Sequence, residues 1–392
     1  MFSLTLRRFY GTLGSKLRHI AVVGSGPAGF YLSQQILKQK DLNVQIDLYE
    51  KLPVPFGLVR YGVAPDHPEV KNVEATFTKV AQDPRVQFLG NVTLGKFQIE
   101  ESGSHPDCLK VVIAGQDVKT KELMQAYDAV VLAYGAAKDR TLGIPGESSK
   151  NVISARNFVG FYNGLPEDRN LDFSLDTDHA VVIGLGNVAI DVARVLCTPI
   201  DELRKTDITE AALEKLSSSR IKKVTILGRR GPLNVAFTIK ELRELIHLKD
   251  CKPSFDLQDF QSMSRDVTKS LQRPRKRLTE LLFKSVLDPP TQKQLDLWGS
   301  NPSKEWKLQL LRTPKEMHAE DKNDYVTGLT VEINQLKGLE DIQPTGNLEK
   351  IDCGLILRSI GYFAIPVEGK TFFLLFLCKD VSKNLNCRWD TI

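Results

Sequence analysis

Two glycine-rich turns, each between a short apolar segment and an amphipathic one, constrain the fold of this chain most strongly. The first, residues 24–29 (GSGPAG), follows the apolar run His19–Val23. The second, residues 184–189 (GLGNVA), follows His179–Ile183. The order strand, G-x-G-x-x-G or G-x-G-x-x-A turn, and helix is typical of a dinucleotide-binding βαβ unit. The pattern predicts an α/β chain with two Rossmann-like dinucleotide-binding domains.

Each glycine of the first turn has its own physical task. Gly24 permits the tight turn, Gly26 lets the backbone approach a pyrophosphate, and Gly29 allows the helix to pack closely on the strand. We expect that helix over residues 30–40 and a second strand over residues 44–49, which is followed by Glu50. A carboxylate here can accept hydrogen bonds from ribose hydroxyls, so the site favours a cofactor with a free 2′-hydroxyl.

The second turn begins in the same way and ends differently. Gly184 and Gly186 take the places of the first two glycines, with a helix expected over residues 190–197 and a strand over residues 223–227. That strand is followed by Gly228, Arg229 and Arg230 instead of an acid. Guanidinium groups can bind a ribose 2′-phosphate, which an acid would repel. The second site is therefore predicted to bind NADP, and FAD with NADPH is the pair that suits two such sites.

Charge is unevenly placed along the 392 residues, whose formal net charge is +5. Residues 1–18 are basic, hydroxylated and free of acid, which is typical of a mitochondrial presequence, with a disordered basic arm as the alternative. A second basic stretch, residues 229–284, has 13 Lys and Arg against 7 Asp and Glu. It could steer an acidic partner or simply form a solvated helix face.

Several classes of protein are disfavoured. The six cysteines form no C-x-x-C pair, which argues against a dithiol redox enzyme and a structural zinc site, and no metal is expected. The longest apolar run, residues 372–378, is far shorter than the roughly 20 residues that span a bilayer, so membrane contact is expected to be at most peripheral. No nucleic-acid module is recognisable, and we expect a monomer that binds no nucleic acid.

Three longer stretches closely resemble the NADPH–adrenodoxin reductase family, the mitochondrial ferredoxin–NADP reductases. They are residues 53–69 (PVPFGLVRYGVAPDHPE), 228–244 (GRRGPLNVAFTIKELRE) and 273–282 (RPRKRLTELL). The resemblance extends from about His19 to Tyr362. It implies an NADP domain inserted into an FAD domain, and electron transfer from NADPH through FAD to a small acidic [2Fe–2S] ferredoxin, such as adrenodoxin. In the mitochondrial matrix, either free or associated with the inner membrane, such transfer supports steroid hydroxylation or iron–sulfur cluster assembly.

The same resemblance implies roles for single residues. The residues expected to contact FAD are Ala28, Glu50, Leu58 and Leu94. Those expected to contact NADP are Gly186, Asn187, Val188, Arg229, Arg230 and Glu241, and those expected to dock the ferredoxin are Arg243, Arg273 and Arg277. His67 and Asp191 match positions that could assist proton or conformational coupling, with a structural hydrogen bond as the alternative for each.

We expect a presequence over residues 1–18, an FAD domain over 19–137, an NADP domain over 138–353, and a partial return to the FAD domain over 354–392. After Tyr362 the resemblance stops, and Trp389 is not followed by the glycine-rich turn of the family. We therefore expect the return segment to be divergent or missing, which would leave a sheet edge uncovered.

Two other functions remain open. One is a catalytically impaired variant that only binds NADP, ferredoxin or both, which the divergent end of the chain suggests. The other is a related two-site flavoprotein, either a disulfide reductase or a glutamate-synthase small subunit. The lack of paired or clustered cysteines counts against both of these flavoproteins.

Overall fold

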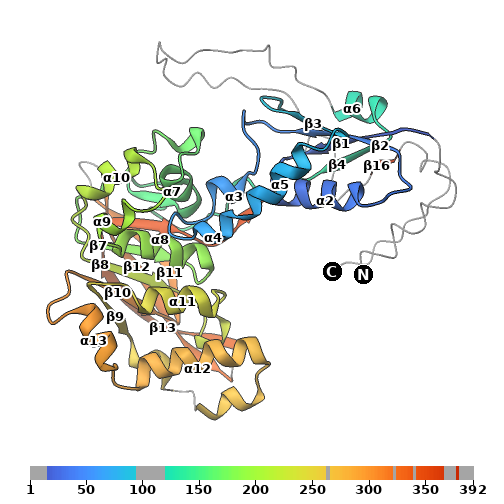
Figure 1. The fold of residues 1–392 in the computed structure, drawn as a ribbon. Coiled ribbons are helices and arrows are strands. Elements are labelled where there is room, and N and C mark those ends of the chain that lie inside the picture. The colour runs from blue at the N-terminus through green and yellow to red at the C-terminus, as the bar shows by residue number, and fades with distance from the viewer. Residues whose placement is uncertain are drawn as a thin grey trace. The chain divides into compact units, whose positions relative to one another are not determined.

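The computed structural model describes residues 16–93, 120–261, 265–320, 324–338, 341–365 and 377–378. The chain divides into two compact units, shown in Figure 1. Unit 1 comprises residues 1–63, 69–138 and 363–392, and unit 2 comprises residues 64–68 and 139–362. The chain therefore enters unit 2 twice, first for only five residues and then for its long central part.

Unit 1 contains one sheet with the strand order β16-β4-β1-β2-β3. The strands are β1 (Arg18–Val23), β2 (Val44–Tyr49), β3 (Val86–Leu89), β4 (Ala129–Leu132) and β16 (Leu377–Cys378). The first four are parallel, and their order 3-2-1-4 is that of a doubly wound dinucleotide-binding fold. The short β16 pairs antiparallel with β4, so this edge is covered over two residues.

Apolar residues on helices cover both faces of this sheet. Phe30 on α2 (Pro27–Leu37) stacks on Phe77 of α5 (Val73–Ala81), with ring centroids 4.9 Å apart, and both pack against β1, β2 and β3. On the other face, Leu123 of α6 (Thr120–Ala126) packs with Ala21, Val23 and Val130. Two short helices, α3 (Leu58–Tyr61) and α4 (Pro68–Lys71), lie between β2 and α5 in the chain.

Unit 2 contains a larger parallel sheet with the strand order β6-β14-β7-β8-β10-β9. Its strands are β6 (Val152–Ser154), β7 (His179–Ile183), β8 (Lys223–Leu227), β9 (Cys251–Phe255), β10 (Lys304–Gln309) and β14 (Leu355–Arg358). Strand β14, which was expected in the return segment, lies instead between β6 and β7 of this sheet. The antiparallel strands β11 (Arg312–Ala319), β12 (Val326–Lys337) and β13 (Asp341–Asp352) form a separate sheet, whose strands are labelled in Figure 1.

The helices of unit 2 bury one continuous core against the parallel sheet, with Trp306 and Tyr162 among its fully buried side chains. They are α7 (Ala155–Tyr162), α8 (Asn187–Cys197), α9 (Ile200–Leu203), α10 (Glu210–Ser217), α11 (Ile239–Ile246), α12 (Arg273–Leu287) and α13 (Gln292–Trp298). Four 3₁₀ turns, η2 (Pro166–Asp168), η3 (Pro232–Asn234), η4 (Leu257–Phe260) and η5 (Arg265–Ser270), and two short strands, β5 (Lys138–Asp139) and β15 (Tyr362–Phe363), are also present. In the described part of the chain, every helix is too short or too polar to cross a membrane.

The strands expected over residues 44–49, 179–183 and 223–227 have those bounds. The two helices after the glycine turns, however, begin three residues earlier than expected. Helix α2 begins at Pro27 and ends at Leu37, and α8 begins at Asn187. In both turns the second glycine is the N-cap, so the helix already includes the last residues of the glycine motif. Proline at the first position of α2 suits this start because its fixed φ is helical.

Candidate nucleotide sites and a buried charge cluster

The first glycine turn joins β1 to α2 and is closed by protein at two of its glycines. Gly24 has φ 107°, and a Cβ there would lie 2.5 Å from the carbonyl oxygen of Ala133. A Cβ on Gly29 would lie 2.1 Å from the carbonyl oxygen of Gly24, because the helix crosses directly over the turn. Gly26 differs, since a Cβ there would meet nothing within 4 Å. The turn is therefore open at the glycine predicted to face a pyrophosphate.

The N-terminus of α2 at this open glycine has no side-chain cap. The adjacent segment approaches it as bare backbone: Phe56 N donates to Ser25 O at 2.9 Å, and Gly57 has φ 49° with its Cβ position 3.0 Å from Gly26 Cα. An uncapped helix N-terminus offers N–H donors and a positive dipole end to an anion. The first turn therefore fits the pyrophosphate of FAD.

Glu50 follows β2 and points its carboxylate at the first turn. Its Oε2 accepts hydrogen bonds from Ser25 N at 3.1 Å and Ser25 Oγ at 2.7 Å, and its Oε1 accepts from Leu52 N at 3.1 Å. These bonds hold the acid at the carboxyl edge of the sheet, from which ribose hydroxyls are bound in such folds. Ala28 and Leu58 are exposed, and Leu94 lies outside the described residues.

The second glycine turn, between β7 and α8, repeats this arrangement. Gly184 has φ 141°, and a Cβ there would lie 2.1 Å from the carbonyl oxygen of Ser359, whereas a Cβ on Gly186 would meet nothing within 4 Å. Gly186 is the N-cap of α8 and also lacks a side-chain cap. Asn187 Oδ1 accepts a hydrogen bond from Thr238 N at 2.8 Å, which ties the start of α8 to the start of α11, and Val188 is half-buried. This turn fits a second dinucleotide.

Arg229 and Arg230 lie directly after β8, beside the second turn. Gly184 N donates to Leu227 O at 2.9 Å, which joins the two segments. Both arginine side chains are exposed, and neither guanidinium contacts a partner among the described residues. Two unneutralised cations at the carboxyl edge of the sheet suit the 2′-phosphate of NADP.

A buried charge cluster in unit 2 is centred on Arg194 of α8, which is 2% exposed. Its Nε and one terminal nitrogen contact the carboxylate of Asp66 at 2.5 and 3.0 Å. The guanidinium also donates to Asp191 Oδ1 at 2.8 Å and to Glu241 Oε2 at 2.9 Å, and it lies 3.6 Å from Glu244 Oε2. One buried cation therefore contacts four carboxylates.

His67 lies in the same cluster, so the structure brings together the two residues predicted to assist coupling. His67 Nε2 is 2.5 Å from Glu244 Oε2, and its Nδ1 is 4.0 Å from Glu241 Oε1. Burial raises the pKa of Asp191 to about 7, with Arg194 opposing the shift and a hydrogen bond to Glu241 adding to it. At neutral pH Asp191 can thus hold or release a proton.

Asp66 of this cluster and Tyr162, on which the cluster acts electrostatically, also have shifted pKa values. Burial alone would raise the pKa of Asp66, but its hydrogen bond with Arg194 lowers it below the usual value. Burial raises the pKa of Tyr162, whose Oη has no hydrogen-bond partner among the described residues. His67, Glu241 and Glu244 are close enough to share a metal ion, but Arg194 already supplies a cation to both carboxylates, and we assign no metal there.

The three arginines expected to dock a partner are exposed on two helices that pack together. Arg243 is on α11, and Arg273 and Arg277 are one turn apart on α12. Figure 1 shows α12 running alongside α11. They provide positive charge on the surface of unit 2.

Comparison with known proteins identifies the family of this chain. The family described as pyridine nucleotide-disulphide oxidoreductase matches residues 18–246. The NADPH:adrenodoxin oxidoreductase, mitochondrial, of Homo sapiens is 48% identical over 361 residues, which cover 91% of this chain and 69% of that protein. The protein of the same name from Salvelinus fontinalis is 45% identical, covering 93% of this chain and 70% of that protein. The chain belongs to the NADPH:adrenodoxin oxidoreductase family.

The fold of this chain is also similar to that of a solved structure. FprA from Mycobacterium tuberculosis, in complex with NADPH, is 36% identical and has a TM-score of 0.79, covering 91% of this chain and 74% of that one. The fold is therefore that of a pyridine nucleotide oxidoreductase with Rossmann-like domains, as predicted. The relatives in the NADPH:adrenodoxin oxidoreductase family are named mitochondrial.

The sequence did not indicate Arg194, Asp66 and Glu244 as members of the charge cluster. Arg194 did give a signal, because it stands three residues after Asp191 in an otherwise apolar helix. A charged residue on a buried helix face needs a partner, but the sequence does not show that the partners come from residues 66, 241 and 244.

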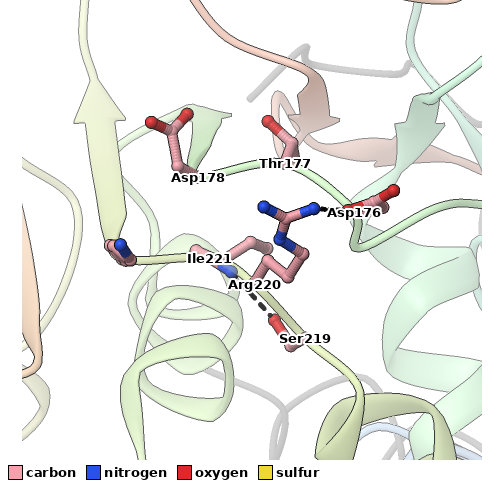
Figure 2. Close-up of a pocket in the computed structure, with 7 residues that line it drawn as sticks. Asp176, Thr177, Asp178, Ser219, Arg220 and Ile221 are labelled. Atoms are coloured by element: carbon pink, nitrogen blue, oxygen red, sulfur yellow. Dashed lines mark hydrogen bonds and ion pairs between the residues drawn. The ribbon is translucent and has the colours of Figure 1, made fainter.

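A surface pocket of about 440 Å³ lies elsewhere in unit 2. It is lined by Asp176, Thr177, Asp178, Ser219, Arg220, Ile221 and Lys222, which precede β7 and β8. Figure 2 shows Arg220 turned towards Asp176, with which it forms an exposed ion pair of 2.8 Å. The pocket lies at the amino ends of these strands, whereas the nucleotide turn of this family lies at their carboxyl ends, so we assign it no role in cofactor binding.

Proposed function

We propose that this chain is a flavoprotein oxidoreductase that passes electrons from NADPH, through FAD, to a [2Fe–2S] ferredoxin of the adrenodoxin type. The observation that carries the proposal is the pair of open glycine turns with opposite endings. Glu50 at the first turn suits a ribose with a free 2′-hydroxyl, and Arg229 with Arg230 at the second suits a ribose 2′-phosphate. The names of the relatives support the same pair of cofactor and acceptor.

The protein contributes binding and orientation. Gly26 and the N-terminus of α2 would hold the FAD pyrophosphate, and Gly186 with the N-terminus of α8 would hold that of NADPH. When bound, NADPH supplies a hydride and FAD converts it into single electrons for the acceptor. In unit 2, His67 and Glu244 form a close polar contact, and Asp191, whose pKa is raised by burial to about 7, can hold or release a proton at neutral pH.

Arg243, Arg273 and Arg277 would bind the acidic ferredoxin. Their exposure and positive charge suit a partner that must associate and dissociate quickly, because charge steering raises the association rate. We place the protein in the mitochondrial matrix, as a monomer that binds no nucleic acid and has at most peripheral contact with the inner membrane. Because both nucleotide turns are complete, this function is favoured over that of an impaired variant that only binds NADP or ferredoxin.

The test is the reduction of a purified adrenodoxin-type ferredoxin by the full chain reconstituted with FAD, with NADPH as the electron donor. We expect ferredoxin reduction that requires both the protein and FAD. Arg273→Glu with Arg277→Glu should raise the KM for ferredoxin about tenfold or more and leave the reduction of the flavin by NADPH unchanged. Lys293→Glu, at an exposed position of α13, is the control for a charge change elsewhere.

Two outcomes would count against the proposal. Flavin reduction by NADPH without any ferredoxin reduction would favour the impaired variant. Equal effects of Lys293→Glu and the α12 substitutions would remove the assignment of the docking surface.

A further inference from the structure

Three successive backbone carbonyls, those of Gly228, Arg229 and Arg230, are each held by a hydrogen bond. Arg312 N donates to Gly228 O at 3.0 Å, and Leu311 N donates to Arg230 O at 3.3 Å. Between them, Asn334 Nδ2 donates to Arg229 O at 3.2 Å. The backbone of residues 228–230, called the arginine turn below, is therefore held by a hydrogen bond at every residue. Both guanidinium groups are nevertheless exposed.

The middle donor is a side chain, whereas the outer two are backbone N–H groups. Asn334 lies on β12, is 4% exposed, and donates its second Nδ2 hydrogen to Thr313 Oγ1 at 2.8 Å. Its backbone N donates to Leu311 O at 2.8 Å. Because a carbonyl can only accept, the contact with Arg229 O determines which end of the amide faces the turn. The two amide hydrogens are thus both used.

The local geometry of β12 directs Asn334 to this place. The pairing of β12 with β13 shifts register between Glu332 and Asn334, and such irregularities re-aim a side chain. Two residues further on, Leu336 packs under the same turn, since a Cβ on Gly231 would lie 2.7 Å from Leu336 Cδ2. The arginine turn therefore rests on β12.

We propose that Asn334 is a positioning residue for recognition of the 2′-phosphate. By fixing the carbonyl of Arg229, it holds the backbone between the two arginines in one conformation, so that both guanidinium groups face the phosphate before it binds. Guanidinium recognition of phosphate is directional, and binding is stronger when the donors do not have to be ordered first. The inference rests on the proposed function, in which Arg229 and Arg230 contact that phosphate.

The test compares two probes that differ only in the 2′-phosphate, adenosine 2′,5′-bisphosphate and adenosine 5′-monophosphate. Calorimetry on the full chain at pH 8 gives the Kd of each. We expect Asn334→Ala to raise the Kd of the bisphosphate by about five- to tenfold, the effect of losing one hydrogen bond, and to change that of the monophosphate by less than about twofold. Asn347→Ala, at an exposed position of the neighbouring β13, should change neither.

If the alanine variant does not fold, Asn334→Leu allows the same comparison, because leucine has nearly the same shape as asparagine, carries no charge and cannot donate a hydrogen bond. If the role of Asn334 were purely structural, its replacement would weaken the binding of both probes by the same factor. The ratio of the two Kd values would then be unchanged, and that result would overturn the inference. Adding Asn334→Ala to Arg229→Ala with Arg230→Ala should cause no further loss, because the residue acts through the arginines.

Failure of this inference can be distinguished from failure of the proposed function. If the double arginine variant loses its preference for the bisphosphate and Asn334→Ala keeps it, only the role of Asn334 is wrong. If the double arginine variant keeps the preference, the assignment of the 2′-phosphate site is wrong as well.

Discussion

Asp191 and Arg194 lie one turn apart on α8, and the Arg194 guanidinium donates a hydrogen bond to Asp191 Oδ1 at 2.8 Å. The same guanidinium contacts the carboxylates of Asp66, Glu241 and Glu244. One arginine cannot neutralise four acids, of which Glu241 is buried and the other three are half-buried, so Asp191 retains a proton that an unfolded chain would release. The raised pKa of Asp191, about 7, expresses that retention.

Asp191→Asn should remove part of the pH dependence of stability. The pKa of Asp191 is raised in the folded protein, so the folded state binds a proton that the unfolded state has lost above about pH 4. The stability from this group is complete below that pH and is lost as pH rises towards and through about 7. We expect the unfolding free energy of the unmodified protein to fall by about 2 kcal/mol more than that of the variant between pH 5.5 and pH 8.5, measured by urea denaturation. Parallel curves for the two proteins would contradict this interpretation.

Arg194→Met should destabilise the protein strongly, because it leaves buried carboxylates without their cation. We expect a loss of about 3–5 kcal/mol in the free energy of unfolding. Arg220→Met is the matched control, since Arg220 forms an ion pair with Asp176 in which both side chains are at least 70% exposed. Its loss should be about 1 kcal/mol or less. Similar losses in both variants would show that the cluster does not stabilise unit 2.

Alanine substitutions at the two glycines of the second turn should affect stability and cofactor binding differently. Gly186→Ala should cost about 1 kcal/mol or less in stability, because a Cβ there meets no protein atom, yet weaken NADPH binding by about tenfold or more. Gly184→Ala should cost about 2 kcal/mol or more, because φ is 141° and the Cβ would lie 2.1 Å from Ser359 O. Thermal unfolding and calorimetry measure the two quantities. A stable Gly186→Ala variant with unchanged NADPH affinity would show that the nucleotide does not bind at this turn.

Arg229→Ala with Arg230→Ala should lower the preference for NADPH over NADH by about 100-fold, since each charge-assisted hydrogen bond contributes roughly 1.5–3 kcal/mol. The affinity for NADH should change little. Arg204→Ala with Lys205→Ala, an exposed pair of cations after α9, removes the same charge from another part of unit 2. Equal weakening of both cofactors would mean that the pair does not read the 2′-phosphate.

The features that could be predicted from the sequence are those that depend on residues close together in the chain. The positive φ of Gly24 and Gly184 and the apolar strands before them depend on neighbouring residues, so the turns and several strand bounds were readable. The charge cluster and the Asn334 contact depend on pairs far apart in the chain, such as Asp66 with Arg194 and Arg229 with Asn334. No periodicity links such pairs. The starts of α2 and α8 were missed because the glycine motif was treated as a loop instead of a helix cap.

If the proposed function is right, this chain binds FAD at the first turn and accepts electrons from NADPH at the second. The most direct measurement is the visible absorption spectrum of the purified chain reconstituted with FAD, recorded without oxygen before and after addition of NADPH. We expect a protein-bound flavin spectrum that is bleached rapidly by NADPH and much more slowly by NADH at the same concentration. A protein that remains colourless after reconstitution, or a bound flavin that NADPH does not bleach, would contradict it.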